Sequence, residues 1–123
     1  METTRVKKQV PCWVVCLKAK TMGMILYNET VGVDLGIERE WLTWMKVTYI
    51  PQVMKTGMFT EFKIYKVLTS EDEGTVSYSV QYFAKSMDQV EKYLEVFAPA
   101  LIEELREKFK DHHAAFRTLL EEM

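Results

Sequence analysis

Hydrophobic and polar residues alternate with a period of two in several segments, which predicts strands with one buried face. Residues 58–69 and 75–83 are predicted to be two such strands, and the short acidic segment 70–74 between them makes them a hairpin. Residues 112–122, HHAAFRTLLEE, are predicted to form the last strand. The first strand, residues 24–33, has two chemically distinct sides, Ile25, Tyr27, Val31 and Val33 against Asn28, Thr30 and Gly32.

Two further segments carry apolar residues at helical spacing. The first helix spans residues 37–50, bends or restarts at Pro51 and ends at Gly57, because proline interrupts a helix and glycine usually terminates one. Its predicted buried face contains Ile37, Trp41, Trp44, Met45 and Thr48. The second helix follows the capping box Ser86-Met87-Asp88-Gln89, with another bend or restart at Pro99. Its predicted buried face contains Met87, Val90, Leu94, Phe97, Leu101 and Leu105.

The predicted order of elements is βαββαβ, which is typical of the ferredoxin-like α+β fold. In this fold both helices lie on one face of a four-stranded antiparallel sheet. The other face is left uncovered, and we therefore expect a homodimer formed through the sheet. A chain of 123 residues is long enough for one core, so residues 24–123 are predicted to be a single domain.

Composition and charge are those of a globular protein, with 48% hydrophobic and 28% charged residues and a net charge of −2. The charge is unevenly distributed, because residues 1–23 contain five Lys or Arg and one Glu, leaving −6 on residues 24–123. An acidic domain repels phosphate backbones, so we expect no nucleic-acid partner.

The basic leader, residues 1–23, has three possible interpretations. As a signal peptide it is poor, since Pro11 and Trp13 interrupt its apolar run and Lys18 and Lys20 stand where small residues should precede a cleavage site. The run is too short to span a bilayer, so we expect no membrane partner. A disordered extension, or upstream sequence preceding a natural start at Met24, fits the abrupt change of pattern better.

The two cysteines, Cys12 and Cys16, both lie in the leader. Two thiols alone do not build a zinc site. The domain itself would contain no disulfide, which suits a cytoplasmic protein.

The segments MILYNETV, EWLTWMKVTYIPQVMKTGMF, YSVQYF, FAPAL and AFRTLLE resemble a family of small bacterial proteins of unknown function. That family is assigned to the dimeric α+β barrels, the superfamily of antibiotic-biosynthesis and haem-degrading monooxygenases. The resemblance covers residues 24–123 and implies a dimeric α+β barrel. Two positions depart from the family pattern: Tyr49 stands where histidine is common, and His113 stands where an aromatic residue is common. Tyr49 lacks the ring nitrogen that could bind metal or carry a proton near neutral pH.

The haem-degrading relatives use a first-strand asparagine, to which Asn28 corresponds, and a second-helix histidine that ligates iron. Residues 87–110 contain no histidine, so we expect no haem. His112 and His113 are neighbours on a predicted strand and would point to opposite faces, where they cannot chelate one metal together. We therefore expect neither a metal nor a cofactor.

The role of Trp41 and Trp44 depends on which face of the sheet meets the helices. If the apolar face does, the tryptophans are core and the polar face lines the dimer barrel. If the apolar face meets a second subunit instead, small polar residues lie beneath the tryptophans and leave room for a ligand. The sequence leaves both arrangements open.

Candidate pocket residues follow from the second arrangement. Asn28 would donate a hydrogen bond to a developing oxyanion, with Gln81 or Tyr82 as a second polar contact. Arg117 either pairs with Glu29 or Glu61 or anchors an acidic ligand. The complete candidate set is Asn28, Trp41, Trp44, Tyr49, Gln81, Tyr82 and Arg117.

Two functions are consistent with these residues. No catalytic set is complete, which favours a non-catalytic or small-molecule-binding homodimer, with a small aromatic compound as the ligand. The alternative, implied by the resemblance, is a cofactor-independent monooxygenase-like enzyme that acts on a small aromatic substrate.

Overall fold

The computed structural model describes residues 24–69 and 73–123. The predicted leader with both cysteines, and part of the predicted acidic loop, lie outside the described residues. Within the described residues, no helix combines the length and the apolar character needed to cross a membrane. The strands are β1 (Ile25–Asp34), β2 (Glu61–Lys66), β3 (Thr75–Ala84) and β4 (His113–Glu121). The helices are α2 (Glu38–Trp44), α3 (Ile50–Lys55), α4 (Met87–Lys92) and α5 (Ala98–Lys108).

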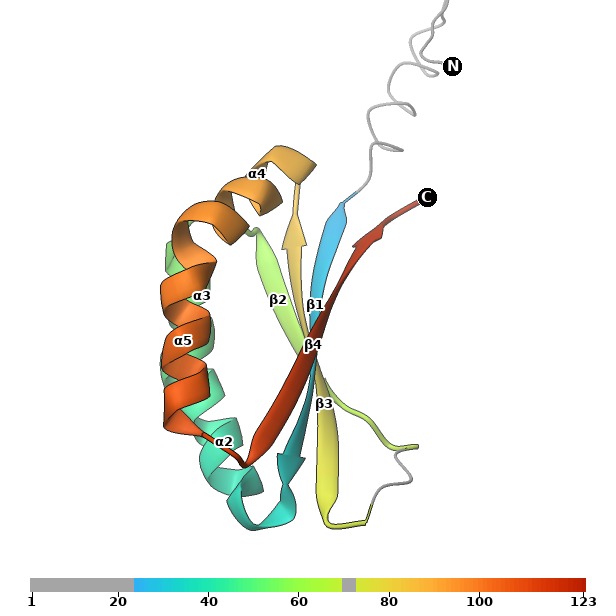
Figure 1. The fold of residues 1–123 in the computed structure, drawn as a ribbon. Coiled ribbons are helices and arrows are strands. Elements are labelled where there is room, and N and C mark those ends of the chain that lie inside the picture. The colour runs from blue at the N-terminus through green and yellow to red at the C-terminus, as the bar shows by residue number, and fades with distance from the viewer. Residues whose placement is uncertain (1–23, 70–72) are drawn as a thin grey trace, which may run out of the picture.

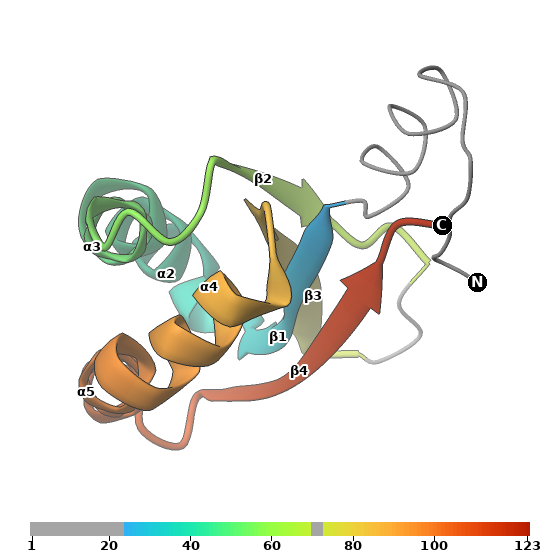
Figure 2. The same cartoon turned by 90° about the horizontal axis from the view of Figure 1, so that it is seen from above.

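The four strands form one antiparallel sheet in the order β2-β3-β1-β4, which confirms the predicted ferredoxin-like α+β fold. β1 is central and pairs with β3 on one side and β4 on the other. All helices lie on one side of the sheet (Figure 1), where α2 and α3 run beside α4 and α5 when seen from above (Figure 2). No other element of the described chain covers the opposite side, called here the open face.

The two helical prolines, Pro51 and Pro99, each follow a widened helical turn. A π-helical turn, Met45–Tyr49, joins α2 to α3 just before Pro51, and a second one, Tyr93–Phe97, joins α4 to α5 just before Pro99. Proline has no N–H to donate and its ring crowds the carbonyl four residues earlier, so a wider turn lets the helix continue. At both predicted interruptions the helix therefore continues, with one wider turn before the proline.

The second π turn shifts the buried face of its helix, which corrects the predicted stripe. Tyr93 and Ala98 are fully buried, whereas Leu94 and Phe97, which were predicted to face the core, are only partly buried. Met87 was also predicted to be buried and is 38% exposed. A wider turn advances the inward face by about one residue, and a regular 3.6-residue period cannot anticipate that.

The helix ends follow the predicted signals. The backbone N–H of Gln89 donates to Ser86 Oγ over 3.4 Å, and Gln89 Oε1 accepts from the backbone N–H of Lys85 over 3.3 Å. The first helix stops before Gly57, which adopts a positive φ of 78°. These contacts satisfy backbone groups that a helix end leaves unpaired.

The apolar face of the sheet meets the helices, which is the placement of the sheet in the first of the two predicted arrangements. The indole of Trp41 is fully buried, with its ring centroid 5.0 Å from that of Tyr78 on β3. Met45 is equally buried one turn further along. The aromatic stripe of the first helix is therefore core at Trp41 and Met45, and the arrangement with small polar residues beneath the tryptophans does not occur.

Candidate functional site

The sheet places one carboxylate inside the core. Glu29 lies in the middle of β1 at an inward position, between Tyr27 and Val31, and only 1% of its surface is exposed. It is the one charged side chain that is fully buried among the described residues. Burying a carboxylate is costly unless it has a partner, so this position calls for a physical explanation.

The partner is Arg117, which the strand register places directly opposite. Glu29 and Arg117 face each other across β1 and β4, and the Nε–H of Arg117 donates to Glu29 Oε2 over 2.9 Å. The arginine side chain stays 28% exposed while the glutamate is enclosed. Of the two predicted partners of Arg117, Glu29 is the one found, because Glu61 lies on β2 at the opposite edge of the sheet.

Four buried tyrosines surround this ion pair. Tyr27 and Tyr82 come from the sheet, whereas Tyr49 and Tyr93 come from the two π turns. The ring centroid of Tyr27 lies 6.0 Å from that of Tyr82 and 5.7 Å from that of Tyr93. Burial raises the pKa of all four hydroxyls, and the nearby Glu29 carboxylate raises each of them further. The tyrosines are therefore neutral throughout the physiological range.

Several polar atoms of this region are buried without a hydrogen-bond partner among the described residues. They include Oε1 of Glu29 and the hydroxyl groups of Tyr27, Tyr49 and Tyr82. Buried polar groups in native proteins are nearly always paired, so a group of unpaired ones distinguishes this region from the rest of the core. We refer to Tyr27, Glu29, Tyr49, Tyr82, Tyr93 and Arg117 as the Glu29 cluster.

The Glu29 carboxyl is in an environment that favours its neutral form. Burial raises its pKa above the ordinary value, and the guanidinium of Arg117 opposes that change only in part. The group can therefore exchange a proton closer to neutral pH than an exposed glutamate can.

Arg117 also lines an open cleft between α5 and β4, with a volume of about 340 Å³. This volume is at the lower end of the range for small-molecule sites. Ile102, Leu105 and Ala115 supply apolar wall, and Lys110 adds a further positive charge. We call this site the α5–β4 cleft.

Arg117 places hydrogen-bond donors at the wall of the α5–β4 cleft. A guanidinium carries five N–H groups. Among the described residues, Arg117 makes a single side-chain hydrogen bond, through Nε to Glu29. The two terminal nitrogens make no further side-chain hydrogen bond among the described residues, although the hydroxyl of Tyr27 lies close to the guanidinium.

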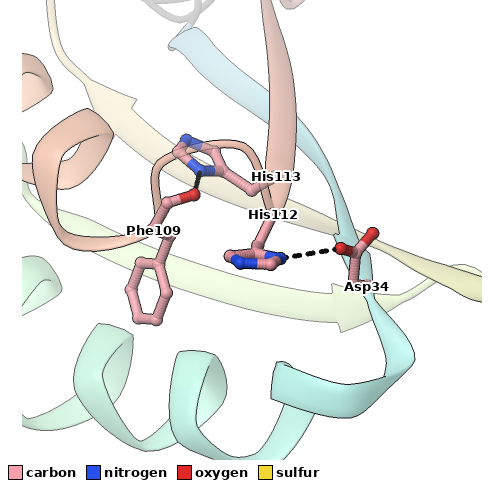
Figure 3. Close-up of polar contacts among 4 residues, drawn as sticks. All are labelled: Asp34, Phe109, His112 and His113. Atoms are coloured by element: carbon pink, nitrogen blue, oxygen red, sulfur yellow. Dashed lines mark hydrogen bonds and ion pairs between the residues drawn. The ribbon is translucent and has the colours of Figure 1, made fainter.

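The two adjacent histidines at the start of β4 have different partners (Figure 3). Nδ1 of His112 lies 3.0 Å from Oδ2 of Asp34, whereas Nδ1 of His113 lies 3.0 Å from the backbone oxygen of Phe109. His113 also lines the α5–β4 cleft. Three or more histidine, cysteine or acidic side chains do not come together as a metal site anywhere in the described ranges.

The structure divides the predicted pocket residues between the two faces of the sheet. Tyr49, Tyr82 and Arg117 belong to the Glu29 cluster, and Trp41 is packed in the same layer. Trp44 is half-buried, with its ring 5.6 Å from that of Tyr49 and at the wall of a separate groove along α2.

Asn28 and Gln81 lie on the open face and are not brought together with the aromatic residues. Asn28 Nδ2 donates to Thr30 Oγ1 over 2.9 Å, and its Oδ1 accepts from Ser79 Oγ over 2.6 Å. Gln81 Nε2 donates to the same Ser79 oxygen over 3.2 Å. The side chain of Asn28 thus forms a hydrogen bond with a residue of the neighbouring strand β3, which is a structural role.

Sequence reasoning overlooked Tyr27, Glu29 and Tyr93 as members of one site. Glu29 could have been found, since an acidic residue at an inward position of an alternating strand is unusual. Tyr93 could also have been found, since it lies three residues after the buried Val90, which is ordinary helical spacing.

The fold and the buried ion pair define a ferredoxin-like α+β domain with a polar group of residues between its sheet and its helices. The chain belongs to the family DUF4286, a domain of unknown function, whose model matches residues 24–123. None of the curated proteins compared with the chain matches it.

The solved structures similar to this chain include the following two. An EthD (ethyl tert-butyl ether d) family protein from Bacillus halodurans superposes with a TM-score of 0.62 at 9% identity, covering 80% of this chain and 99% of the other. A PII-like signaling protein from Thermus thermophilus gives a TM-score of 0.35 at 14% identity, covering 80% and 89%. The first of these likenesses extends to the fold alone.

Proposed function

We propose that the protein is a homodimer that binds a small aromatic acid in the α5–β4 cleft, with Arg117 as the anchor. The observation that carries this proposal is the position of Arg117. Its Nε is held by Glu29, and its guanidinium lines a cleft of about 340 Å³, with the hydroxyl of Tyr27 as its neutral neighbour.

The chemistry of the cleft suits a carboxylate with an apolar body. A guanidinium binds a carboxylate through two parallel hydrogen bonds, and Glu29 fixes its orientation in advance. The apolar walls from Ile102, Leu105 and Ala115 offer contact surface for a ring. Arg106 and Lys110 at the same cleft add positive charge, which the lining residues Glu107 and Asp111 balance, so Arg117 is the specific anchor for an anion.

The binding proposal is tested by calorimetric titration with benzoate and with benzamide, a neutral molecule of nearly the same shape. We expect benzoate to bind at least about tenfold more tightly, because the charge-assisted bonds to Arg117 are lost with benzamide. The double variant Glu29→Gln/Arg117→Gln, which removes both charges together, should lose this preference. Equal binding of the two compounds, no binding of benzoate, or an unchanged preference in the double variant would each refute the proposal.

The homodimer is supported by the chemistry of the open face. Cross-strand partners share a face, so Leu26 of β1, Phe83 of β3 and Leu120 of β4 lie together there, and Phe116 lies further along β4 with 63% of its surface exposed. On the open face, β1 carries Leu26, Asn28, Thr30 and Gly32. None of these residues is charged, and neither are the residues opposite them on β3 and β4. On this face β2 does carry charge, with Glu61 opposite Phe83 and Lys63 Nζ 5.5 Å from the Phe83 ring centroid. Depletion of charge on the other three strands is typical of the core of a protein interface, and the charges on β2 would lie at its rim.

The dimer is tested by analytical ultracentrifugation of the full chain at micromolar concentration. We expect twice the monomer mass of 14.5 kDa for the wild type. Phe116→Glu should give a monomer, since it places a charge in the interface. Val47→Glu is the matched control, because Val47 is 69% exposed on the helical side and should leave the dimer intact. A monomeric wild type, or a Phe116→Glu variant that remains dimeric, would contradict the proposal.

A second candidate function is a cofactor-independent oxygenase that acts on a small phenol. It is favoured by the position of Arg117, because this guanidinium lines the cleft, where it can stabilise the electron-rich phenolate form of a bound phenol, while Glu29 holds it in place. This candidate predicts oxygen consumption when a phenol is added, and loss of that consumption in Glu29→Gln. Binding without chemistry predicts none in either protein.

A further inference from the structure

We infer that binding of an acid in the α5–β4 cleft is coupled to uptake of a proton by Glu29. The inference rests on the proposed binding function. It adds that binding of a ligand in the cleft changes the protonation of a buried side chain. Its basis is a shared partner: Arg117 holds Glu29 on one side and lines the cleft on the other.

One guanidinium would then serve two carboxylates. Without a ligand, Oε2 of Glu29 accepts from Arg117 over 2.9 Å and one negative charge balances one positive charge. A ligand carboxylate on the terminal N–H groups adds a second negative charge next to a side chain that is 1% exposed. Two carboxylates that share one site cannot both remain ionised easily, so one of them takes up a proton.

Glu29 is the carboxyl that takes up the proton, because it is buried whereas the ligand remains in an open cleft. The groups that face it are Arg117 from β4 and the four tyrosines of the Glu29 cluster, from β1, β3 and the two π turns. Arginine stays ionised and the buried tyrosines stay neutral over the physiological range. No second fully buried carboxyl is present in the described part of the chain.

The interior can accommodate the protonated form. Oε1 of Glu29 has no partner among the described residues when the carboxyl is ionised. In the neutral acid one oxygen carries a proton and becomes a donor. The hydroxyl oxygens of Tyr27, Tyr49 and Tyr82 are unpaired in the same region and provide neutral, polar surroundings for it.

His113 is the other group that could take up a proton, because it lines the cleft and lies four residues from Arg117 on the same strand. Its Nδ1 is 3.0 Å from the backbone oxygen of Phe109. Glu107 and Asp111 also line the cleft but are exposed. Variants must therefore separate Glu29 from His113.

The experiment is calorimetric titration of benzoate into the full chain from about pH 5.5 to about pH 8.5, in MES and bis-Tris at the acidic end and in HEPES and Tris at the basic end. Buffers with different ionisation enthalpies give different heats in proportion to the protons taken up. For the wild type we expect net uptake of up to about one proton per subunit, passing through a maximum within this range. Glu29→Gln should still bind benzoate, with a Kd that no longer changes with pH through proton uptake, and should show no uptake, whereas His113→Gln should keep the uptake.

The possible failures are distinguishable. Wild-type binding with no uptake at any pH would overturn the coupling and leave the binding function standing. Uptake that persists in Glu29→Gln and disappears in His113→Gln would also overturn it, because the proton would then belong to the histidine. Absence of benzoate binding in the wild type would refute the proposed function itself.

Discussion

Replacing Arg117 with glutamine is expected to lower the free energy of unfolding by about 3–5 kcal/mol near pH 8 and by much less near pH 5. The substitution removes the one positive charge that faces Glu29, whose side chain is 1% exposed and cannot reach water. An unpaired buried carboxylate is among the most costly groups in a protein core.

The pH dependence follows from the direction of the pKa change. Burial already raises the pKa of Glu29 above 4.5, and loss of Arg117 removes the attraction that opposes this. The folded variant then holds its proton more tightly than the unfolded chain does. Its stability is greatest below about pH 4.5 and falls as the pH rises through the folded-state pKa.

Urea unfolding of the wild type and of Arg117→Gln at several pH values measures this effect. The double variant Glu29→Gln/Arg117→Gln is the matched control. It leaves no unpaired charge and should recover more than half of the loss near pH 8. If Arg117→Gln costs the same at every pH, or if the double variant is no more stable than the single one, the Glu29–Arg117 pair does not hold the site together.

Replacing Trp41 with alanine is expected to lower the free energy of unfolding by about 3–5 kcal/mol. Its indole is fully buried against Tyr78, and alanine would leave a large cavity between the first helix and the sheet. Unfolding followed by far-UV circular dichroism measures the loss. Trp41→Phe, which keeps most of the ring volume, should lose less and should remain folded if the alanine variant does not.

Val47→Ala is the control, because Val47 follows Trp41 in the same helical segment and is 69% exposed. It measures how much truncation of an exposed side chain lowers the free energy of unfolding. Its effect should stay within about 0.5 kcal/mol. If Trp41→Ala cost no more than Val47→Ala, the indole would not be part of the core. Trp44 is half-buried and should give an intermediate value.

The sequence was sufficient to predict the fold, for reasons visible in particular residues. The alternation from Ile25 to Val33 gives β1 its inward face, and the capping box at Ser86 fixes the start of α4. Both signals are local, so they survive without knowledge of the tertiary structure. The order of the elements then leaves few ways of building one sheet.

The candidate site was predicted only in part, because it depends on register and on helix winding. The ion pair exists because β1 and β4 pair with Glu29 opposite Arg117, and the sequence alone offered Glu61 equally. The π turn that begins at Tyr93 places Ala98 instead of Phe97 on the inward face, and the pattern of apolar residues does not announce this change. Asn28 and Gln81 were separated from the aromatic residues once the apolar face proved to meet the helices.

The most direct test of an acid anchored by Arg117 is the nuclear magnetic resonance signal of its own Nε–H group during titration of the full chain. That group donates to Glu29 over 2.9 Å, and its signal is assigned by its loss in Glu29→Gln/Arg117→Gln. We predict that benzoate shifts this signal to a saturating value and that benzamide leaves it in place. A signal that does not move with benzoate, or that moves equally with both compounds, would contradict Arg117 as the anchor.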